Sequence, residues 1–175
     1  IKKRLQLGPA NHMTHISNLE SIIKREGLYA FNHLKNNAYE NLSNLDVQKG
    51  RSNIVLLATG RPLHDYVPLY FGFKTPMVAW NQARNEELIF LRVSLDVLSK
   101  QGVVVANGNA RAKETKFRLF QTIEDLSFLN VKAINSVKYA HDPKMKLQKQ
   151  AEILVPDFLP IVDILDVICY SAAAA

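Results

Sequence analysis

This chain has 175 residues, of which 47% are hydrophobic and 22% charged, shares that are typical of a soluble globular protein. Its length predicts one domain, over residues 1–175. Cys169 is the only cysteine, which excludes an intrachain disulfide, and its apolar neighbours predict a structural thiol in a reducing compartment. The longest apolar stretch, 158–170, contains Asp163 and Asp166 and is too short to cross a bilayer, so no membrane-spanning segment is expected.

The net charge of +6 is unevenly distributed along the chain. Residues 107–149 hold nine Lys or Arg and four Asp or Glu, so this quarter of the sequence carries +5 of the total. A basic block of this kind can attract a polyanion, and single-stranded nucleic acid is the obvious candidate. The charge pattern alone is explained equally well by a surface that is simply solvated.

The first expected elements are a strand and a helix. Polar and apolar residues alternate at 12–16, as in a strand. Ser17 and Glu20 have the spacing of a capping box, which predicts a helix that begins there, and Gly27 fits a left-handed residue that ends it. Residues 30–53 are rich in Asn, Lys and Tyr, and we expect a partly helical excursion that covers a site as a lid.

The rest of the chain predicts short strands and few helices. Apolar runs with β-branched residues predict strands at 54–58, 67–71, 87–93, 102–106, 150–155 and 164–170. A short helix is expected at Asp96 and another at 123–129, whereas 132–149 is expected to be mostly irregular. Many short strands with segregated helices indicate the α+β class rather than an alternating parallel sheet.

The most unusual segment is 63–71, which reads LHDYVPLYF and continues to Pro76. A core strand has no physical need for a His, an Asp, two Tyr, a Phe and a Pro in nine positions. Pro68 and Pro76 limit a regular hydrogen-bond ladder and favour a strand end beside a cleft. Tyr70 and Phe71 are then either ordinary core aromatics or walls of a pocket.

Glu152 is a lone carboxylate within the apolar, strand-like run 150–155. It is either an outward-facing acid on a half-exposed strand or a semi-buried acid that stabilises developing positive charge or accepts a proton. His15 and Arg51 also have two possible roles, one structural and one in ligand binding. A strand histidine is commonly structural and a loop arginine commonly faces solvent, but each is also suited to hold a ligand.

Two kinds of site are poorly supported. His12 and His15 point to opposite faces if their segment is a strand, and the sequence has no Cys cluster or His-Glu-x-x-His element, so no metal site is expected. The seven glycines are scattered and form no phosphate-binding loop, so a bound nucleotide would need another kind of cradle.

Taken together, these motifs resemble the DarT family of DNA ADP-ribosyltransferases, the toxin half of a bacterial toxin–antitoxin pair. The resemblance covers nearly the whole chain in family order, and the central nonapeptide is highly specific. The matching segments are HMTHISNL at 12–19, II at 22–23, EGL at 26–28, LHDYVPLYF at 63–71, PM at 76–77, QAE at 150–152 and ICYS at 168–171. The chain after Tyr170 is shorter than the family pattern implies, which predicts a truncated or unassigned C-terminal end.

The resemblance implies the ADP-ribosyltransferase fold: two facing, mainly antiparallel sheets with peripheral helices and NAD in the cleft between them. It implies that Glu152 is the catalytic glutamate and that Arg51 assists it, countering the diphosphate or the reacting base. The NAD-binding residues that it implies are His15, Thr14, Asn18, Tyr70, Phe71 and Arg51.

The acceptor implied by the resemblance is a base in single-stranded DNA, with thymidine favoured over guanosine. The nucleic-acid-binding residues then expected are Asn109, Lys113, Lys116, Tyr139, His141, Lys144, Lys146 and Lys149. A macrodomain antitoxin is the expected partner, and the protein is expected to be a monomer in the bacterial cytoplasm. Two alternatives stay open: the same chemistry on RNA or protein, and a non-catalytic nucleic-acid-binding module of the same fold.

Overall fold

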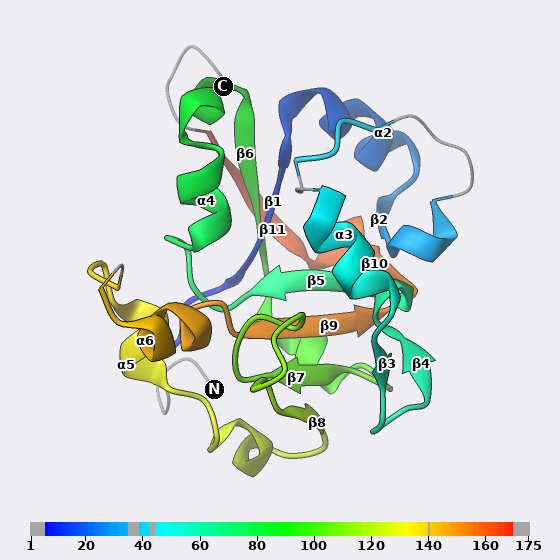
Figure 1. Cartoon of the computed structure of the whole chain (residues 1–175). Coiled ribbons are helices and arrows are strands. Elements are labelled where there is room, and N and C mark those ends of the chain that lie inside the picture. The colour runs from blue at the N-terminus through cyan, green and yellow to red at the C-terminus, as the bar shows by residue number, and fades with distance from the viewer. Residues whose placement is uncertain (1–5, 35–38, 43–44, 140, 170–175) are drawn as a thin grey trace.

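A computed structural model of the chain describes residues 6–34, 39–42, 45–139 and 141–169 (Figure 1). Among these residues the largest sheet has seven strands in the order β11-β6-β1-β5-β9-β7-β8, and β10 pairs with β2 and β3 with β4 in two small sheets. Each described strand pair is antiparallel. The strands are β1 (Ala10–His15), β2 (Gly27–Tyr29), β3 (Val55–Leu56), β4 (Arg61–Pro62), β5 (Tyr66–Tyr70), β6 (Leu88–Val93), β7 (Val104–Ala106), β8 (Phe117–Leu119), β9 (Glu152–Pro156), β10 (Phe158–Pro160) and β11 (Ile164–Cys169).

The helices are short and lie around the sheet, with α3 and α4 on either side of β1 in Figure 1. The α-helices are α2 (Leu19–Lys24), α3 (Leu45–Ser52), α4 (Pro76–Trp80), α5 (Val131–Asn135) and α6 (Pro143–Gln148). The 3-10 helices are η1 (Ile16–Asn18), η2 (Phe31–His33), η3 (Leu63–Asp65), η4 (Gln82–Glu87), η5 (Leu95–Ser99), η6 (Ile123–Leu126) and η7 (Ile161–Asp163). The predicted α+β class with antiparallel sheets is confirmed.

The large sheet consists of two halves that meet at a single register pair. Asn11 of β1 lies opposite Tyr70 of β5, whereas β1 and β6 pair over six residues and β5 and β9 over five. In Figure 1 the strands β5, β9 and β7 are roughly horizontal, while β6, β1 and β11 run from top to bottom. The two facing sheets that the resemblance implies are therefore present as halves of one continuous sheet.

Side-chain alternation along β9 separates the core from the site. Ile153 and Val155 pack into the main hydrophobic core, whereas Leu154 belongs to a smaller cluster on the opposite face. Glu152 shares the face of Leu154 and lies opposite Tyr70 of β5 in the ladder. The two-residue period of the strand therefore turns one carboxylate away from the core, as the sequence predicts.

The helix predicted after β1 is present, but its ends differ from the prediction. Ser17 does not form the capping box: its backbone N–H donates to the His15 side chain at the start of η1, and Glu20 pairs with Lys24 instead of reaching back. Glu26, with a φ of 57°, takes the left-handed position. Gly27 is required for another reason, since its φ is 153° and a Cβ there would lie 2.2 Å from the Leu159 carbonyl oxygen.

Other differences concern short elements. The prediction that 132–149 is mostly irregular is wrong, because α5 extends into this range as far as Asn135 and α6 lies within it. The strand predicted at 54–58 is reduced to the two residues of β3. The helix predicted at 123–129 is the 3-10 helix η6, and Ser94 rather than Asp96 caps η5. Cys169 is partly buried against the core. Tyr170 and Ser171, which belong to the matched motifs, lie outside the described residues.

Candidate active site

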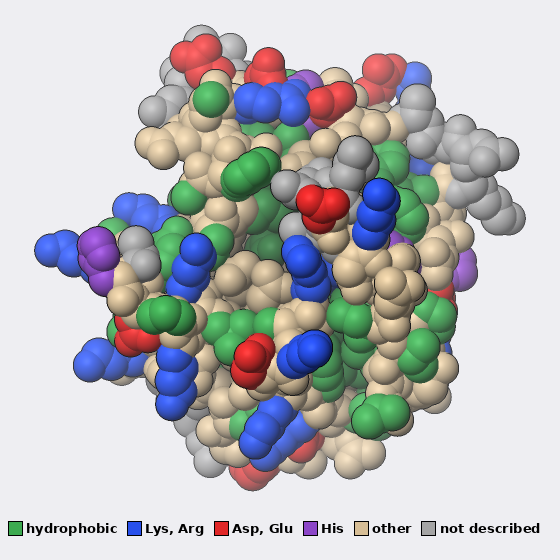
Figure 2. Space-filling view, viewed as in Figure 1, with side chains coloured by type: hydrophobic (Ala, Val, Ile, Leu, Met, Phe, Trp, Pro, Cys, Tyr) green, Lys and Arg blue, Asp and Glu red, His purple; other side chains and the backbone are tan. Residues whose placement is uncertain are grey.

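A cavity opens between the two halves of the sheet, and Figure 2 shows a hollow on this face of the molecule with hydrophobic side chains at its base. Three groups of side chains line it. Strand β1 and the helices after it contribute His12, Met13, Thr14, Asn18 and Ile22. The excursion between β2 and β3 contributes Phe31, residues 39–42, Gln48 and Arg51. The LHDYVPLYF segment and α4 contribute His64, Tyr66, Tyr70 and Met77.

An ion pair between Arg51 and Glu152 joins α3 to β9 at the wall of this cavity. The Arg51 guanidinium donates to Glu152 Oε2 from both terminal nitrogens at 3.2 Å, and to Oε1 at 3.3 Å. The backbone N–H of Ala110 donates to Oε1 at 3.0 Å. The Glu152 side chain is 1% exposed and that of Arg51 is 12% exposed. The structure therefore excludes the outward-facing alternative for Glu152.

Burial alone would lower the pKa of Arg51, but the charge and hydrogen bonds of Glu152 outweigh burial and raise it. The Arg51 guanidinium is thus held in its charged form within a poorly hydrated wall. Arg51 lines the cavity and donates to both oxygens of the Glu152 carboxylate, so the Arg51 side chain lies between Glu152 and the cavity. The sequence places these two residues 101 positions apart, and the structure brings them together.

Tyr70 lies beside this pair, but the neighbouring Phe71 does not. Burial and the negative charge of Glu152 raise the pKa of the Tyr70 hydroxyl well above its usual range, while Arg51 acts in the opposite direction. The hydroxyl donates to the sulfur of Met77 at 3.7 Å, and both side chains line the cavity. Phe71 is 3% exposed and packs in the main hydrophobic core. The structure therefore supports a pocket role for Tyr70 and gives Phe71 a core position.

His12, rather than His15, lines the cavity on the side of β1. The Nδ1 atom of His12 lies 3.0 Å from the carbonyl oxygen of Pro68, which can only accept, so Nδ1 carries the hydrogen and Nε2 is an acceptor. Burial lowers the pKa of His12, and the bond to Pro68 opposes this only in part. The imidazole is therefore neutral at pH 7.

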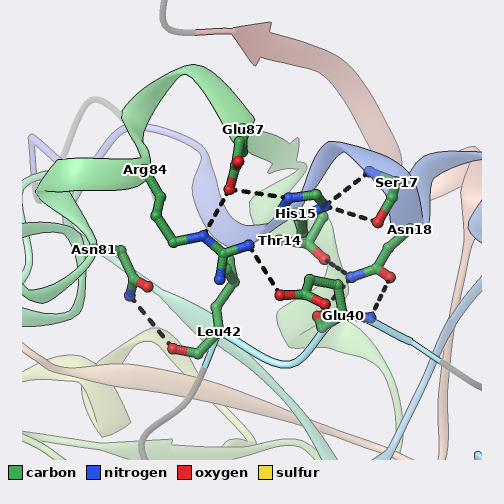
Figure 3. Close-up of polar contacts among 9 residues, drawn as sticks. All are labelled: Thr14, His15, Ser17, Asn18, Glu40, Leu42, Asn81, Arg84 and Glu87. Carbon is green, nitrogen blue, oxygen red and sulfur yellow. Dashed lines mark hydrogen bonds and ion pairs between the residues drawn. The ribbon is translucent and has the colours of Figure 1, made fainter.

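His15 has both ring nitrogens engaged by protein groups (Figure 3). Its Nδ1 accepts from the backbone N–H of Ser17 at 3.1 Å and lies 2.7 Å from the Ser17 hydroxyl, and its Nε2 lies 3.3 Å from the Glu87 carboxylate. The structure therefore does not support the predicted NAD contact of His15: the cavity is lined by His12 instead, and His15 contacts Ser17 of η1 and Glu87 of η4.

Thr14 and Asn18, which the resemblance assigns to NAD, both line the cavity and contact each other. The Asn18 amide donates to the Thr14 hydroxyl oxygen at 3.0 Å. It also forms two hydrogen bonds with the backbone of Glu40, which belongs to the segment 39–42 (Figure 3). Thr14 keeps its hydroxyl hydrogen for a ligand, whereas the donors of Asn18 are taken by protein groups.

His64 is a cavity residue to which the sequence assigned no role, although it lies in the unusual LHDYVPLYF segment. It is 7% exposed, its ring packs on Phe31 with centroids 4.5 Å apart, and its buried Nε2 has no hydrogen-bond partner among the described residues. Burial and the nearby charge of Arg51 lower the pKa of His64, and Asp65 opposes them. A neutral ring with an unused nitrogen in a cavity wall is suited to a ligand hydrogen bond.

The predicted nucleic-acid-binding residues divide into exposed and buried groups. Lys113, Lys116, Lys144, Lys146 and His141 are exposed, and Tyr139 is partly exposed. Figure 2 shows Lys and Arg side chains around the hollow and over α5 and α6. Asn109 bonds Gln150 through its amide and accepts from the Arg111 backbone, and it leads into Ala110, which holds Glu152.

Lys149 is the exception, because it is 1% exposed. Its Nζ donates to the carbonyl oxygen of Ile134 at 3.0 Å and to that of Ser136, at the C-terminal end of α5. The ammonium group also lies 5.3 Å from the centre of the Tyr139 ring. Burial, followed by the charge of Lys74, lowers its pKa. The assignment of Lys149 to nucleic-acid binding is therefore wrong, since the side chain fixes α5 to α6.

Two further observations concern the described part of the chain. None of its helices is long and apolar enough to span a membrane. Its His, Cys, Asp and Glu side chains form no cluster of three or more that could hold a metal ion.

The geometry agrees with comparisons to known proteins. The model of a family described as ssDNA thymidine ADP-ribosyltransferase, DarT, matches residues 11–175. A curated DNA ADP-ribosyl transferase from Thermus sp. (strain 2.9) is 29% identical over 93% of this chain and 81% of its own length. One from Thermus aquaticus is 28% identical over 85% of this chain and 69% of its own length.

Solved structures extend the similarity to three dimensions. Thermus sp. 2.9 DarT in complex with ADP-ribosylated ssDNA has a TM-score of 0.88 and 26% identity, covering 97% of this chain and 84% of that one. The same protein in complex with NAD+ has a TM-score of 0.80 and 27% identity, covering 95% and 83%. Thermosipho africanus DarTG in complex with ADP-ribose is 19% identical with a TM-score of 0.81, covers 95% of this chain and 45% of that one, and shares the fold.

Proposed function

The chain belongs to the DarT family of single-stranded-DNA thymidine ADP-ribosyltransferases, and we propose that it binds NAD in the cavity between its half-sheets and transfers ADP-ribose to a thymidine base through Glu152 and Arg51. It has the ADP-ribosyltransferase fold and uses NAD as co-substrate to modify DNA. The observation that carries the residue assignment is the Arg51–Glu152 pair: the Arg51 guanidinium lines the cavity beside Tyr70, and the buried Glu152 carboxylate lies directly behind it.

The residues that line the cavity fit the chemical parts of NAD. Tyr70 and Met77 offer an aromatic and polarisable wall to the nicotinamide ring. His12, Thr14 and His64 offer ring nitrogens and a hydroxyl to the ribose hydroxyls, because each has an unused hydrogen-bonding atom. Arg51 offers a positive charge to the diphosphate.

The transfer breaks one bond and forms another at the same ribose carbon. NAD supplies an ADP-ribosyl group whose ribose carbon becomes electron-poor as nicotinamide leaves with the bonding electron pair. The Glu152 carboxylate stabilises this positive charge and takes the proton from the base nitrogen that attacks the carbon. Arg51 stabilises the negative charge on the base. This role requires Arg51 to release one of the two carboxylate oxygens that it holds here.

An unpaired base suits such a site, since it reaches a pocket without the cost of opening a duplex. The exposed basic side chains around the hollow, including Lys113, Lys116, Lys144 and Lys146, would hold the strand through its phosphates. Tyr139 and His141 would stack on flanking bases.

The test is incubation with NAD and oligonucleotides of mixed sequence, followed by mass spectrometry. We expect one ADP-ribose mapped to thymidine in single-stranded DNA and none with Glu152→Gln. Modification of RNA or protein instead of DNA would favour the first alternative. NAD binding with no transfer to any of the three acceptors would favour a non-catalytic nucleic-acid-binding module.

Further proposals concern the biological setting. The family membership supports the role of toxin in a bacterial toxin–antitoxin pair, active as one ADP-ribosyltransferase domain over residues 1–175 and as a monomer in the cytoplasm. We also propose a macrodomain antitoxin that removes the modification. Adding such a macrodomain to the modified oligonucleotide should restore its original mass, and light scattering should give the mass of one chain.

A further inference from the structure

We propose that Asn18 is a positioning residue that holds residues 39–42 in place as one wall of the NAD cavity, assisted by Arg84 and Asn81. These four residues are called the wall segment below, and all of them line the cavity. The inference rests on the proposed function and assigns Asn18 an indirect role in NAD binding, in contrast to the direct contact that the resemblance implies.

The Asn18 side chain binds the backbone of Glu40 in the way that a neighbouring strand would. Its Oδ1 accepts from the Glu40 N–H at 2.9 Å, and its Nδ2 donates to the Glu40 carbonyl oxygen at 2.9 Å. The second Nδ2 hydrogen goes to the Thr14 hydroxyl oxygen at 3.0 Å. Asn18 is 8% exposed, so both of its donors are used inside the protein and neither is left for a ligand.

A second anchor fixes the other end of the wall segment. The Asn81 amide donates to the Leu42 carbonyl oxygen at 3.4 Å and to the Met77 carbonyl oxygen at 3.0 Å, which ties the segment to α4 (Figure 3). Leu42 is 7% exposed and packs with Met13 and Phe90. Side chains from outside the wall segment therefore hold its backbone at two points.

The Glu40 side chain adds an outer connection. It accepts from Arg84 at 2.9 Å, and Arg84 also donates to Glu87 at 2.6 Å, which in turn lies 3.3 Å from His15 Nε2 (Figure 3). Arg84 and Glu40 are 39% and 45% exposed, so this pair is screened by solvent and weaker than the buried amide contacts. Asn18 is therefore the main anchor and Arg84 an auxiliary one.

Asn18→Asp is the sharpest test, because it keeps the shape and the acceptor of the Glu40 N–H but removes the donors to the Glu40 carbonyl oxygen and to the Thr14 hydroxyl. We expect NAD binding, measured by calorimetry without DNA, to weaken about tenfold, as expected for a buried hydrogen bond replaced by repulsion. The KM for NAD should rise similarly, with little change in kcat at saturating NAD. Asn130→Asp is the matched control, since Asn130 also uses both ends of its amide but caps α5 outside the cavity lining.

Hydrogen exchange separates positioning from direct contact. If Asn18 positions the wall segment, the Glu40 amide exchanges faster in NAD-free Asn18→Asp than in the unmodified enzyme, and saturating NAD restores its protection. If Asn18 instead contacts NAD directly, the NAD-free exchange at Glu40 is unchanged, and the inference is overturned. Unchanged NAD affinity in Asn18→Asp overturns it as well.

Arg84→Ala provides a second variant at a partly exposed position, where folding is not at risk. We expect two- to threefold weaker NAD binding, roughly the effect of one surface ion pair. Arg92→Ala is its control, since Arg92 of β6 forms a similarly exposed ion pair with Asp166 of the neighbouring strand β11. Equal NAD affinity in the two variants contradicts the role of Arg84. A wild-type protein that binds no NAD would instead refute the proposed function.

Discussion

The ion pair between Arg51 and Glu152 predicts that the two single variants destabilise the protein more than the double variant does. In Glu152→Ala the buried guanidinium loses its partner and the Ala110 N–H loses its acceptor. In Arg51→Ala the carboxylate, which is 1% exposed, keeps the Ala110 N–H as its one donor among the described residues. Removing both charges at once leaves neither one unpaired.

The expected magnitudes follow from this difference in burial. Breaking a buried pair costs about 3–5 kcal/mol of unfolding free energy. We expect Glu152→Ala to cost about 3 kcal/mol, because the Arg51 side chain is 12% exposed and can reach water, and Arg51→Ala to cost about 4 kcal/mol. The double variant should lose about 2 kcal/mol, which is the unpaired Ala110 N–H plus lost packing. The coupling energy between the two substitutions is then on the order of 5 kcal/mol. A measured coupling energy below about 2 kcal/mol would contradict a strongly interacting buried pair.

Urea unfolding without NAD measures all three variants. With a slope of about 2 kcal/mol per molar urea, a loss of 3 kcal/mol lowers the midpoint by about 1.5 M. Glu152→Gln should stay within about 1–2 kcal/mol of the wild type, because its amide oxygen still accepts from Ala110. It should nevertheless lose at least about 100-fold in kcat, since an amide cannot take the proton. Single-variant losses that add to the double-variant loss would refute the buried pair.

Two other predictions concern charge. The double variant Lys144→Ala, Lys146→Ala should weaken single-stranded DNA binding most at low salt, reduce the slope of log K against log salt by about 1.4 and leave stability unchanged. Lys149→Ala should instead lower the urea midpoint, because its side chain is buried and bonded to α5. An unchanged urea midpoint in Lys149→Ala would contradict this structural role. The pKa of His12 is lowered from 6.5, so its ring is neutral at pH 6.5 and above. NAD affinity should therefore be constant from pH 8 to 6.5 and fall only below pH 6.5. A decline already between pH 7.5 and 6.5 would argue against His12 as a neutral acceptor.

Local sequence patterns were sufficient to predict the strands that position the site. The strands around 12–15, 67–71 and 87–93 were predicted from short alternating or apolar runs, although β6 buries both of its faces and shows no two-residue period. The two-residue period of β9 placed Glu152 on the face opposite Ile153, and the structure confirms it. The helices α5 and α6 were missed because their Lys residues obscure a short amphipathic pattern. Their caps were visible, since Asn130 and the pair Asp142–Pro143 are N-terminal signals.

Contacts between distant segments decide the rest of the site. The pairing of Arg51 with Glu152 depends on how α3 packs over the sheet, and no local pattern encodes it. Lys149 resembles its exposed neighbours Lys144 and Lys146 in sequence, but the carbonyl groups that bury it belong to α5. The sequence places His64 in the central motif but indicates no role for it, because an unused ring nitrogen becomes apparent only when its surroundings are known.

Among the strands that the structure describes, the two half-sheets share only the register pair of Asn11 and Tyr70. A continuous hydrogen-bond ladder would fix a strand spacing of about 4.8 Å all along the seam. With a single pair, the distance between the halves is set instead by the size of the side chains that lie between them. Substitution of Met13 or Met77, which line the cavity, would therefore change its width without removing a backbone hydrogen bond of the seam. The scaffold can thus diversify what it accommodates while the acid on β9 stays where it is.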